Sequence, residues 1–328
     1  MPGADILVVS VDSTTGWRAA ARELVAALER AGARVALKST GSVPRVRTFM
    51  LTDLVEARAA RAAASRGIAE HDPAAIIYCS MTAALLWPRP GAIWLDSIAA
   101  ENRPGRHGVW QRALERRRLA QAPVVLAMSE PAVELIEDRA REIVVIPTPV
   151  EASGPEPAER DIAAITYVSG DPKKRRPELV LEAWHRARRD QETLVVAGAA
   201  GGEGAAGVRP AGKLPAEEYR ALLRRSRAFV AAPRREDYGI APLEALADGC
   251  MLVSTPASGP YPALAIARQL DPRLVSDDLA AAIRAALDDP VPDYARRAAE
   301  LLAPFSRAAV DSAIAQRVLP RLLDQRRP

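Results

Sequence analysis

The chain has 328 residues, of which 49% are hydrophobic and 26% are charged, as is typical of a folded protein with room for two ordinary cores. This composition excludes an intrinsically disordered chain. A net charge of +4 suits phosphate ligands or an anionic membrane surface, but it is too small to indicate nucleic acid. The aromatic residues, 4% of the chain, are not interleaved with basic ones.

The first residues predict a strand rather than a targeting signal. The apolar run in MPGADILVVSVDS stops at Asp12, and no basic segment precedes it. No apolar run in the chain approaches the length of a membrane span. We therefore expect a cytoplasmic protein, and we leave open a peripheral contact with the inner face of the membrane.

Cysteine and histidine usage predicts no metal site. Cys79 and Cys250 lie in apolar, strand-like contexts, which favours buried reduced thiols, with one disulfide left open. The three histidines are far apart and have no neighbouring ligands at metal-binding spacing. We expect neither a bound metal nor a cofactor.

Short apolar runs alternate with amphipathic helices along the first half, which is typical of βαβ units and a parallel sheet. We predict a first domain over residues 1–150, with a clear helix at 17–31 that ends before Gly32. Strands are expected at residues 6–11, 34–37, 75–79, 92–95, 124–128 and 143–146.

A proline-rich stretch divides the chain. Residues 147–160 hold four prolines and a glycine, and we take 151–160 as the linker. The alternation then restarts and predicts a second domain at 161–305. Because open α/β sheets bind ligands at the carboxyl ends of their strands, we expect a site in a cleft between the domains. Strands are expected at 162–168, 193–197, 228–232 and 251–254, and helices at 177–189, 215–226 and 242–248.

The segment EDYGIAPLEALADG at residues 236–249 carries the clearest functional pattern. It places Glu236 on a strand-to-helix loop and Glu244 in the first turn of a helix, which Pro242 opens and Gly249 ends. Free N–H groups at a helix start attract phosphate, whereas carboxylates accept hydrogen bonds from hydroxyls. The pattern suits a nucleotide-diphosphate sugar. The alternative is that Glu244 only interacts with its own helix and Glu236 is merely solvated.

These residues resemble the E-x7-E motif of GT-B glycosyltransferases of the retaining GT4 type, with Tyr238 in place of the usual phenylalanine. The resemblance extends more loosely over residues 143–264. VIPTPVE at 145–151 is similar to the family's V-I-P-N-G-V-D junction. YVSGDPKKRRPELVLEAW at 167–184 is similar to its Y-V-G-R segment, but the arginine after the glycine is missing, since Ser169-Gly170 stands there.

The resemblance implies an α/β, GT-B fold, in which two Rossmann-like domains face a cleft and a last helix, here within 306–328, crosses back to the first domain. It implies that Glu244 holds ribose hydroxyls, whereas Glu236 holds sugar hydroxyls and stabilises charge at the anomeric carbon. Lys174 or Arg175 takes the place of the family's lysine on the departing diphosphate. Further donor-binding candidates are Gly16 in the loop after the first strand, Tyr238, Gly239 and Ile240 of the motif, and Lys213 and Leu214 near the base.

Several of these functional assignments have a purely structural alternative. Residues 173–176 would otherwise be a solvated charge run, and the residues around Gly16 an N-cap. Asp96 ends a predicted strand and is our acceptor-side catalytic candidate, but it would otherwise be a turn residue. The basic residues 103–118 predict either a helix on an anionic membrane or a surface helix packed by its apolar side.

Two further segments bear on the site. The glycine-rich residues 198–204 are expected to form a loop rather than a dinucleotide site, because no helix begins where the phosphate would need one. Residues 254–263 resemble the family's T-x-x-G-G-x-P-E turn, with Gly259 as its first glycine.

The sequence therefore predicts a metal-independent, retaining, hexosyltransferase-like enzyme that moves a sugar from a nucleotide sugar to an acceptor hydroxyl. The acceptor is left open among a glycan, a lipid and a small molecule, and no nucleic-acid partner is expected. One alternative is a non-catalytic GT-B scaffold that binds nucleotide sugars as a partner subunit. A GT-B epimerase is a further alternative.

Overall fold

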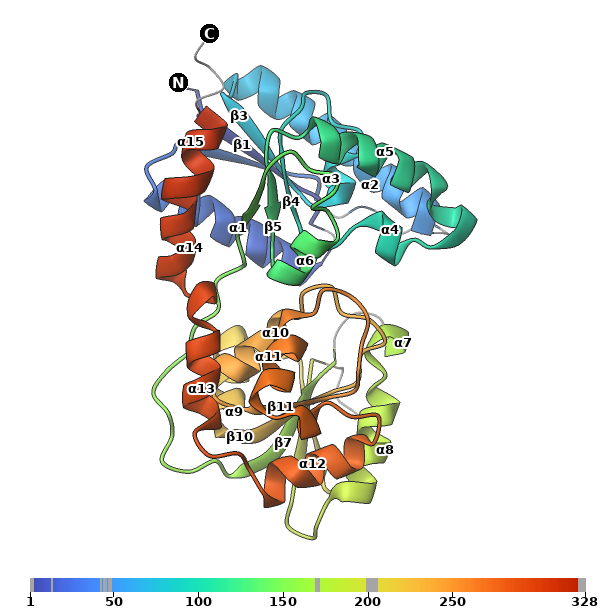
Figure 1. Cartoon of the computed structure of the whole chain (residues 1–328), viewed down its shortest axis with the longest axis vertical. Coiled ribbons are helices and arrows are strands. Elements are labelled where there is room, and N and C mark those ends of the chain that lie inside the picture. Colours follow the sequence, from blue (N-terminus) through green and yellow to red (C-terminus); the bar gives the residue numbers. More distant parts are fainter. Residues whose placement is uncertain are drawn as a thin grey trace. The chain divides into compact units, whose positions relative to one another are not determined.

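The computed structural model describes residues 3–12, 14–41, 43, 46, 49–168, 172–198 and 206–323 (Figure 1). The chain divides into two compact units. Unit 1 comprises residues 1–149 and 307–328, and unit 2 comprises residues 150–306. The C-terminal segment therefore folds with the N-terminal part of the chain, and each unit contains one parallel sheet.

Unit 1 is built on a six-stranded parallel sheet with the order β2-β1-β3-β4-β5-β6. Strands β1, β3, β4 and β5 are almost completely buried, as expected for apolar strands covered on both faces. The edge strand β2 is partly exposed. The strands are β1 (Ile6–Ser10), β2 (Val35–Ser39), β3 (Ala75–Cys79), β4 (Ala92–Leu95), β5 (Val125–Ala127) and β6 (Ile143–Val145).

Small residues bury α2 in the core of unit 1, and an ion pair joins two other helices of the unit. Ala57, Ala60 and Ala64 lie on one face of α2 and are completely buried in the core. The C-terminal helix α14 lies beside α1 (Figure 1), where Arg30 makes two bonds of 2.7 and 2.8 Å to Asp311. The helices are α1 (Thr15–Arg30), α2 (Phe49–His71), α3 (Met81–Ala84), α4 (Ala99–Asn102), η1 (Gly105–Gly108), α5 (Val109–Gln121), α6 (Glu130–Glu134), α14 (Arg307–Ala313), the π-helix η4 (Ile314–Val318) and α15 (Leu319–Leu323).

Unit 2 contains a five-stranded parallel sheet with the order β11-β10-β7-β8-β9. Helices α9 and α10 contact each other, as do α8 and α12. The strands are β7 (Ile162–Tyr167), β8 (Leu194–Ala197), β9 (Val208–Gly212), β10 (Ser226–Ala231) and β11 (Met251–Ser254). The helices are α7 (Pro172–Arg175), α8 (Pro177–Ala187), α9 (Ala216–Arg225), α10 (Ile240–Ala247), α11 (Pro262–Leu270), η2 (Pro272–Leu274), α12 (Leu279–Asp288), α13 (Tyr294–Leu301) and η3 (Ala303–Phe305).

Each sheet has one point at which the direction of strand addition reverses. In unit 1 it lies between β1 and β3, and in unit 2 it lies between β7 and β10. The connections that leave the two strands at such a point diverge to opposite sides, which opens a crevice at the carboxyl ends of the strands. The loops after β7 and β10 are therefore where unit 2 is expected to bind a ligand.

Several local predictions differ from the structure. Strand β9 was not predicted. It contains Pro210, which is tolerated because β9 is an edge strand that pairs on one side only. Ser226 was predicted to end a helix and instead begins β10. The long helix α2 was not predicted either. The two cysteines agree with expectation, since Cys79 and Cys250 are both buried and unpaired.

The basic segment at 103–118 is not a single helix. A short 3₁₀ helix, η1, precedes α5, and Trp110 and Leu114 of α5 pack against the core of unit 1. Val109 is left exposed. The apolar side of α5 is thus used inside the unit, which favours the surface-helix interpretation. Among the described residues, no helix is both long and apolar enough to cross a membrane.

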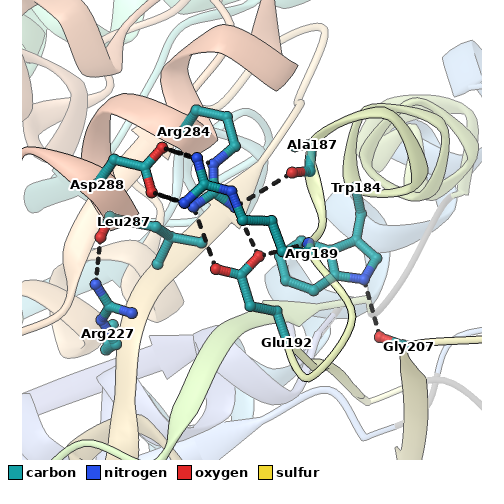
Figure 2. Close-up of polar contacts among 9 residues, drawn as sticks. All are labelled: Trp184, Ala187, Arg189, Glu192, Gly207, Arg227, Arg284, Leu287 and Asp288. Carbon is teal, nitrogen blue, oxygen red and sulfur yellow. Dashed lines mark hydrogen bonds and ion pairs between the residues drawn. The ribbon is translucent and has the colours of Figure 1, made fainter.

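An ion-pair network fastens the α8–β8 connection of unit 2 to α12 (Figure 2). Arg284 of α12 donates to both carboxylate oxygens of Glu192, at 2.6 and 3.2 Å, and to the Ala187 carbonyl at 3.2 Å. Arg189 makes two bonds of 2.8 and 2.9 Å to Asp288, which Arg284 also contacts. One guanidinium therefore links the loop, the end of α8 and the end of α12.

We predict that Arg284→Met lowers the free energy of unfolding by about 2 kcal/mol, because Glu192 and Asp288 lose a shared charged donor. Urea unfolding followed by tryptophan fluorescence measures this change. Arg296→Met is the matched control, since Arg296 pairs with Glu300 and Asp293 on the exposed surface, where water and salt screen the charges, and its loss should have a clearly smaller effect. Equal effects of the two substitutions would contradict the prediction.

Candidate active site

The loop between β10 and α10 carries Glu236 at the reversal point of the unit 2 sheet. The Glu236 side chain is almost completely buried, with the residue 4% exposed, so the interpretation that it is merely solvated is wrong. Its backbone N–H donates to the Ser258 carbonyl at 3.0 Å. Gly259 follows with a φ of +98°, and a Cβ there would collide with the Glu236 carbonyl, so this close approach of the two loops needs glycine.

Two cations from α7 meet the Glu236 carboxylate. Arg175 donates to Glu236 Oε2, and Lys174 Nζ lies 3.8 Å from Glu236 Oε1. The backbone reinforces this arrangement, because the Arg234 N–H donates to the Lys174 carbonyl at 2.9 Å. Burial lowers the pKa of Arg175. Lys174 and Arg175 are thus part of a charged cluster with Glu236 and do not belong to a solvated charge run.

Asp237 extends this cluster on the other side. Its carboxylate lies 3.4 Å from Lys174 Nζ and accepts a 2.7 Å bond from Arg235 Nε. Burial works against ionisation of Asp237, but Lys174 and Arg235 hold its pKa below the usual value. Asp237 and Arg235 were not singled out from the sequence, although both adjoin Glu236 in the motif.

Arg176 has a structural function in the same region. Its backbone is left-handed, with a φ of +49°, at the start of α8. Its side chain donates to the Ala232 carbonyl at 2.7 Å and to Thr255 Oγ1 at 3.0 Å. Arg176 therefore joins the ends of β10 and β11 to the turn that presents Lys174 and Arg175.

Gly239 allows α10 to begin directly beside Glu236. Its φ is +78°, and a Cβ would lie 2.8 Å from the Tyr261 ring and 3.0 Å from Glu236 Cγ. Helix α10 starts at Ile240, two residues before Pro242. Glu244 is consequently in the second turn of the helix, and its predicted place in the first turn is wrong. Tyr238 is buried next to Gly239.

Glu244 lies in a different electrostatic environment from Glu236. Burial raises the pKa of Glu244 to about 7, Arg220 lowers it, and Asp248 raises it further. Arg220 Nη1 is 3.7 Å from Glu244 Oε1, whereas Arg220 Nε is 2.5 Å from Asp248 Oδ2. The guanidinium is therefore engaged more closely by Asp248, and burial dominates at Glu244. Arg220 was missed from the sequence because it lies on α9, outside the motif.

The remaining candidates fall in two places. Lys213 is exposed and Leu214 half-buried between β9 and α9 of unit 2. Gly16 and Asp96 belong to unit 1. Gly16 lies in the first turn of α1, where Thr14 accepts a 3.1 Å bond from the Trp17 N–H as an N-cap, and Asp96 follows the last residue of β4.

Unit 2 thus collects Glu236, Lys174, Arg175, Tyr238, Gly239 and Ile240 around one loop, with Glu244 on the adjoining helix. Ser169-Gly170, where the family's arginine is missing, and most of the loop expected at 198–204 lie outside the described residues. In the part of the chain that the structure describes, no group of three or more His, Cys, Asp or Glu side chains is arranged to hold a metal ion.

Comparison with known proteins agrees with this architecture. Residues 152–301 match the family model described as Glycosyl transferases group 1. No curated protein sequence matches the chain significantly.

Solved structures share its fold at low sequence identity. Sucrose-phosphate synthase from Thermosynechococcus elongatus superposes with a TM-score of 0.65 at 15% identity, covering 95% of this chain and 97% of that one. WaaG, a glycosyltransferase involved in lipopolysaccharide biosynthesis, superposes with a TM-score of 0.64 at 13% identity, covering 98% of each chain. The α,α-trehalose-phosphate synthase (UDP-forming) from Burkholderia xenovorans superposes with a TM-score of 0.65 at 11% identity, covering 94% of this chain and 98% of that one.

All three are similar to this chain over nearly its whole length, so both Rossmann-like units are included in the likeness. The match of residues 152–301 covers most of unit 2, where the Glu236 cluster and Glu244 lie. Most of unit 2 is therefore similar to the Glycosyl transferases group 1 family, in a chain that has the GT-B fold.

Proposed function

We propose that this protein is a retaining glycosyltransferase that moves a sugar from a nucleotide-diphosphate donor to an acceptor hydroxyl. The observation that carries the proposal is the buried Glu236 carboxylate, held by Arg175 and Lys174 at the start of α10. The group 1 glycosyltransferase match over the same residues supports glycosyl transfer. We expect the protein to act in the cytoplasm, on a glycan, lipid or small-molecule acceptor.

The charges of the cluster suit a departing diphosphate. Lys174, Arg175 and Arg235 carry three positive charges against the two carboxylates of Glu236 and Asp237. Charge-assisted hydrogen bonds from such cations stabilise negative charge as it develops on a leaving group. The first N–H groups of α10 have no acceptor within the helix and add to this positive end.

The two glutamates are assigned different parts of the donor. Glu236 would hold the hydroxyls of the transferred sugar and stabilise positive charge at its anomeric carbon. Glu244 would hold the ribose hydroxyls. No side chain acts as a nucleophile in this proposal, and the leaving phosphate takes the acceptor proton. In unit 1, we propose Gly16, in the first turn of α1 rather than in the expected loop, for contact with the donor phosphates, and Asp96 as the acceptor-side acid.

Release of nucleoside diphosphate separates an enzyme from a non-catalytic scaffold. A thermal-shift screen of nucleotide sugars first identifies the donor, since a ligand at a hundred times its Kd stabilises by about 2.7 kcal/mol. The enzyme then releases nucleoside diphosphate from that donor when an acceptor is present, and NMR of the product shows the retained anomeric configuration. A donor that binds but is never cleaved with any acceptor class would favour the scaffold.

We predict that, at pH 8, where Glu244 is ionised, Glu244→Gln weakens the binding of nucleoside diphosphate by roughly tenfold, because a neutral amide loses charge-assisted bonds to the ribose. Glu236→Gln should leave this affinity largely unchanged, since a nucleoside diphosphate carries no transferred sugar, and should instead lower kcat. Calorimetry on both variants and turnover with the identified donor measure the difference. If only Glu236→Gln weakens the nucleotide, the two assignments are reversed.

The raised pKa of Glu244 predicts a pH-dependent stability. The folded protein keeps this carboxyl protonated up to about pH 7, whereas the unfolded chain releases the proton near the ordinary value of 4.5. The free energy of unfolding therefore falls between about pH 4.5 and 7 and stays lower above pH 7. Glu244→Gln should be more stable than wild type, with an advantage roughly 2 kcal/mol larger at pH 8 than at pH 5 in urea unfolding. An equal difference at both pH values would contradict this.

We predict that turnover continues after divalent cations are removed, because Lys174, Arg175 and the α10 terminus supply the positive charge that a metal would otherwise provide. Release of nucleoside diphosphate in excess chelator measures this. The control is the same sample with Mg²⁺ or Mn²⁺ restored, which should change the rate by less than about twofold. Complete loss in chelator that is reversed by metal would disprove metal independence.

A further inference from the structure

Tyr167 ends β7 at the reversal point of the unit 2 sheet and is unusually exposed. The strand residues before it are buried, yet 36% of Tyr167 is accessible. Its ring packs against that of Tyr219 on α9, with centroids 4.9 Å apart and planes inclined by 49°. A partly exposed aromatic ring is thus fixed in place at the edge where the sheet is expected to bind ligands.

The neighbouring backbone leaves room for this ring. Gly198 directly follows the last residue of β8 with a φ of +87°, and a Cβ there would lie 2.9 Å from Tyr167 Cε2. Any larger residue would therefore displace the ring. Burial lowers the pKa of Arg175, and Tyr261, Asp237 and Tyr167 act in the opposite direction. Tyr167 is therefore within electrostatic range of a proposed phosphate-binding cation.

Tyr219 provides a second and independent observation. The residue is 7% exposed, and among the described residues its buried hydroxyl has no hydrogen-bond partner. Buried hydroxyls are normally satisfied, so an exception calls for an explanation. Burial raises the pKa of Tyr219, and the charge of Glu244 raises it further. The next residue on α9, Arg220, approaches Glu244 to 3.7 Å.

We propose that Tyr219 and Tyr167 form the nucleoside end of the donor site. The Tyr219 hydroxyl bonds to the ribose alongside Glu244, and the base stacks on the exposed ring of Tyr167. This inference rests on the proposed function, and it adds two aromatic side chains of unit 2 to the contacts that hold the donor's nucleoside. An aromatic ring stacks on any base, so Tyr167 contributes affinity with little discrimination among bases.

The two tyrosines are tested by calorimetry with uridine, guanosine and adenosine diphosphates and with inorganic pyrophosphate. Tyr167→Leu should weaken the best-bound nucleoside diphosphate by roughly tenfold, whereas Tyr167→Phe, which keeps the ring, should bind it like wild type. Pyrophosphate contacts only the cations and should bind equally to all three proteins. Unchanged nucleotide affinity in Tyr167→Leu, or an equal loss for pyrophosphate, would overturn the role of Tyr167.

Tyr219→Phe removes a single hydroxyl. It should weaken the ribonucleoside diphosphate by roughly fivefold, and the loss should vanish with the 2′,3′-dideoxy form of the same nucleotide. Its thermal midpoint should not fall, because an unsatisfied buried hydroxyl is removed. Tyr294→Phe is the matched control, since that hydroxyl accepts a 3.2 Å bond from the Leu252 N–H. It should lower the midpoint and leave nucleotide affinity unchanged.

The failure of this inference is distinct from failure of the proposed function. The ribose role of Tyr219 is overturned, while the proposed function stands, in either of two cases. In one, Tyr219→Phe binds the ribonucleotide like wild type; in the other, its affinity for the dideoxy nucleotide falls by the same factor as its affinity for the ribonucleotide. If no nucleoside diphosphate binds the wild-type protein, the proposed function and this inference are both overturned.

Discussion

The buried carboxylate of Glu236 is the constraint on which the candidate site depends. A charge removed from water costs several kcal/mol unless opposite charges and hydrogen bonds replace the lost hydration. Arg175 and Lys174 meet this requirement, which ties the turn after β7 to the loop after β10. Gly239 and Gly259 follow from the same constraint, because a side chain at either position would push against Glu236. The two cations, the Glu236 carboxylate and the first turn of α10 are thus held in one fixed arrangement.

The two motif glutamates have opposite electrostatics although one loop and helix carry both. Adjacent cations compensate the charge of Glu236, whereas Glu244 is half-buried and its nearest cation, Arg220, is 3.7 Å away. Pairs of carboxylates in unlike environments are a common way for one site to supply two chemical functions. A carboxylate that already has cationic partners suits charge stabilisation during transfer. One with a pKa of about 7 gains more from ligand hydroxyls that bond to its ionised form.

The sequence predicts the parallel sheets well because their strands are short apolar runs, such as those at β1, β3 and β10, which burial on both faces requires. It predicts the Glu236 loop because the glycine, proline and carboxylates are adjacent in the chain. It misses β9, whose edge position removes the need for an apolar pattern. It also misses Arg220 and Tyr219, because α9 reaches Glu244 only through packing between helices distant in sequence.

The position of Arg220 explains why Glu244 remains poorly compensated. Arg220 Nε lies 2.5 Å from Asp248, whose side chain is completely buried and also accepts bonds of 2.8 and 2.9 Å from Ser153. The guanidinium is therefore held by the more deeply buried carboxylate and reaches Glu244 only at 3.7 Å. Coulomb energy falls with distance, so this second contact does not offset the burial of Glu244. Asp248 thus keeps Glu244 without a full partner of its own, so a ligand hydroxyl need not displace a cation to reach it.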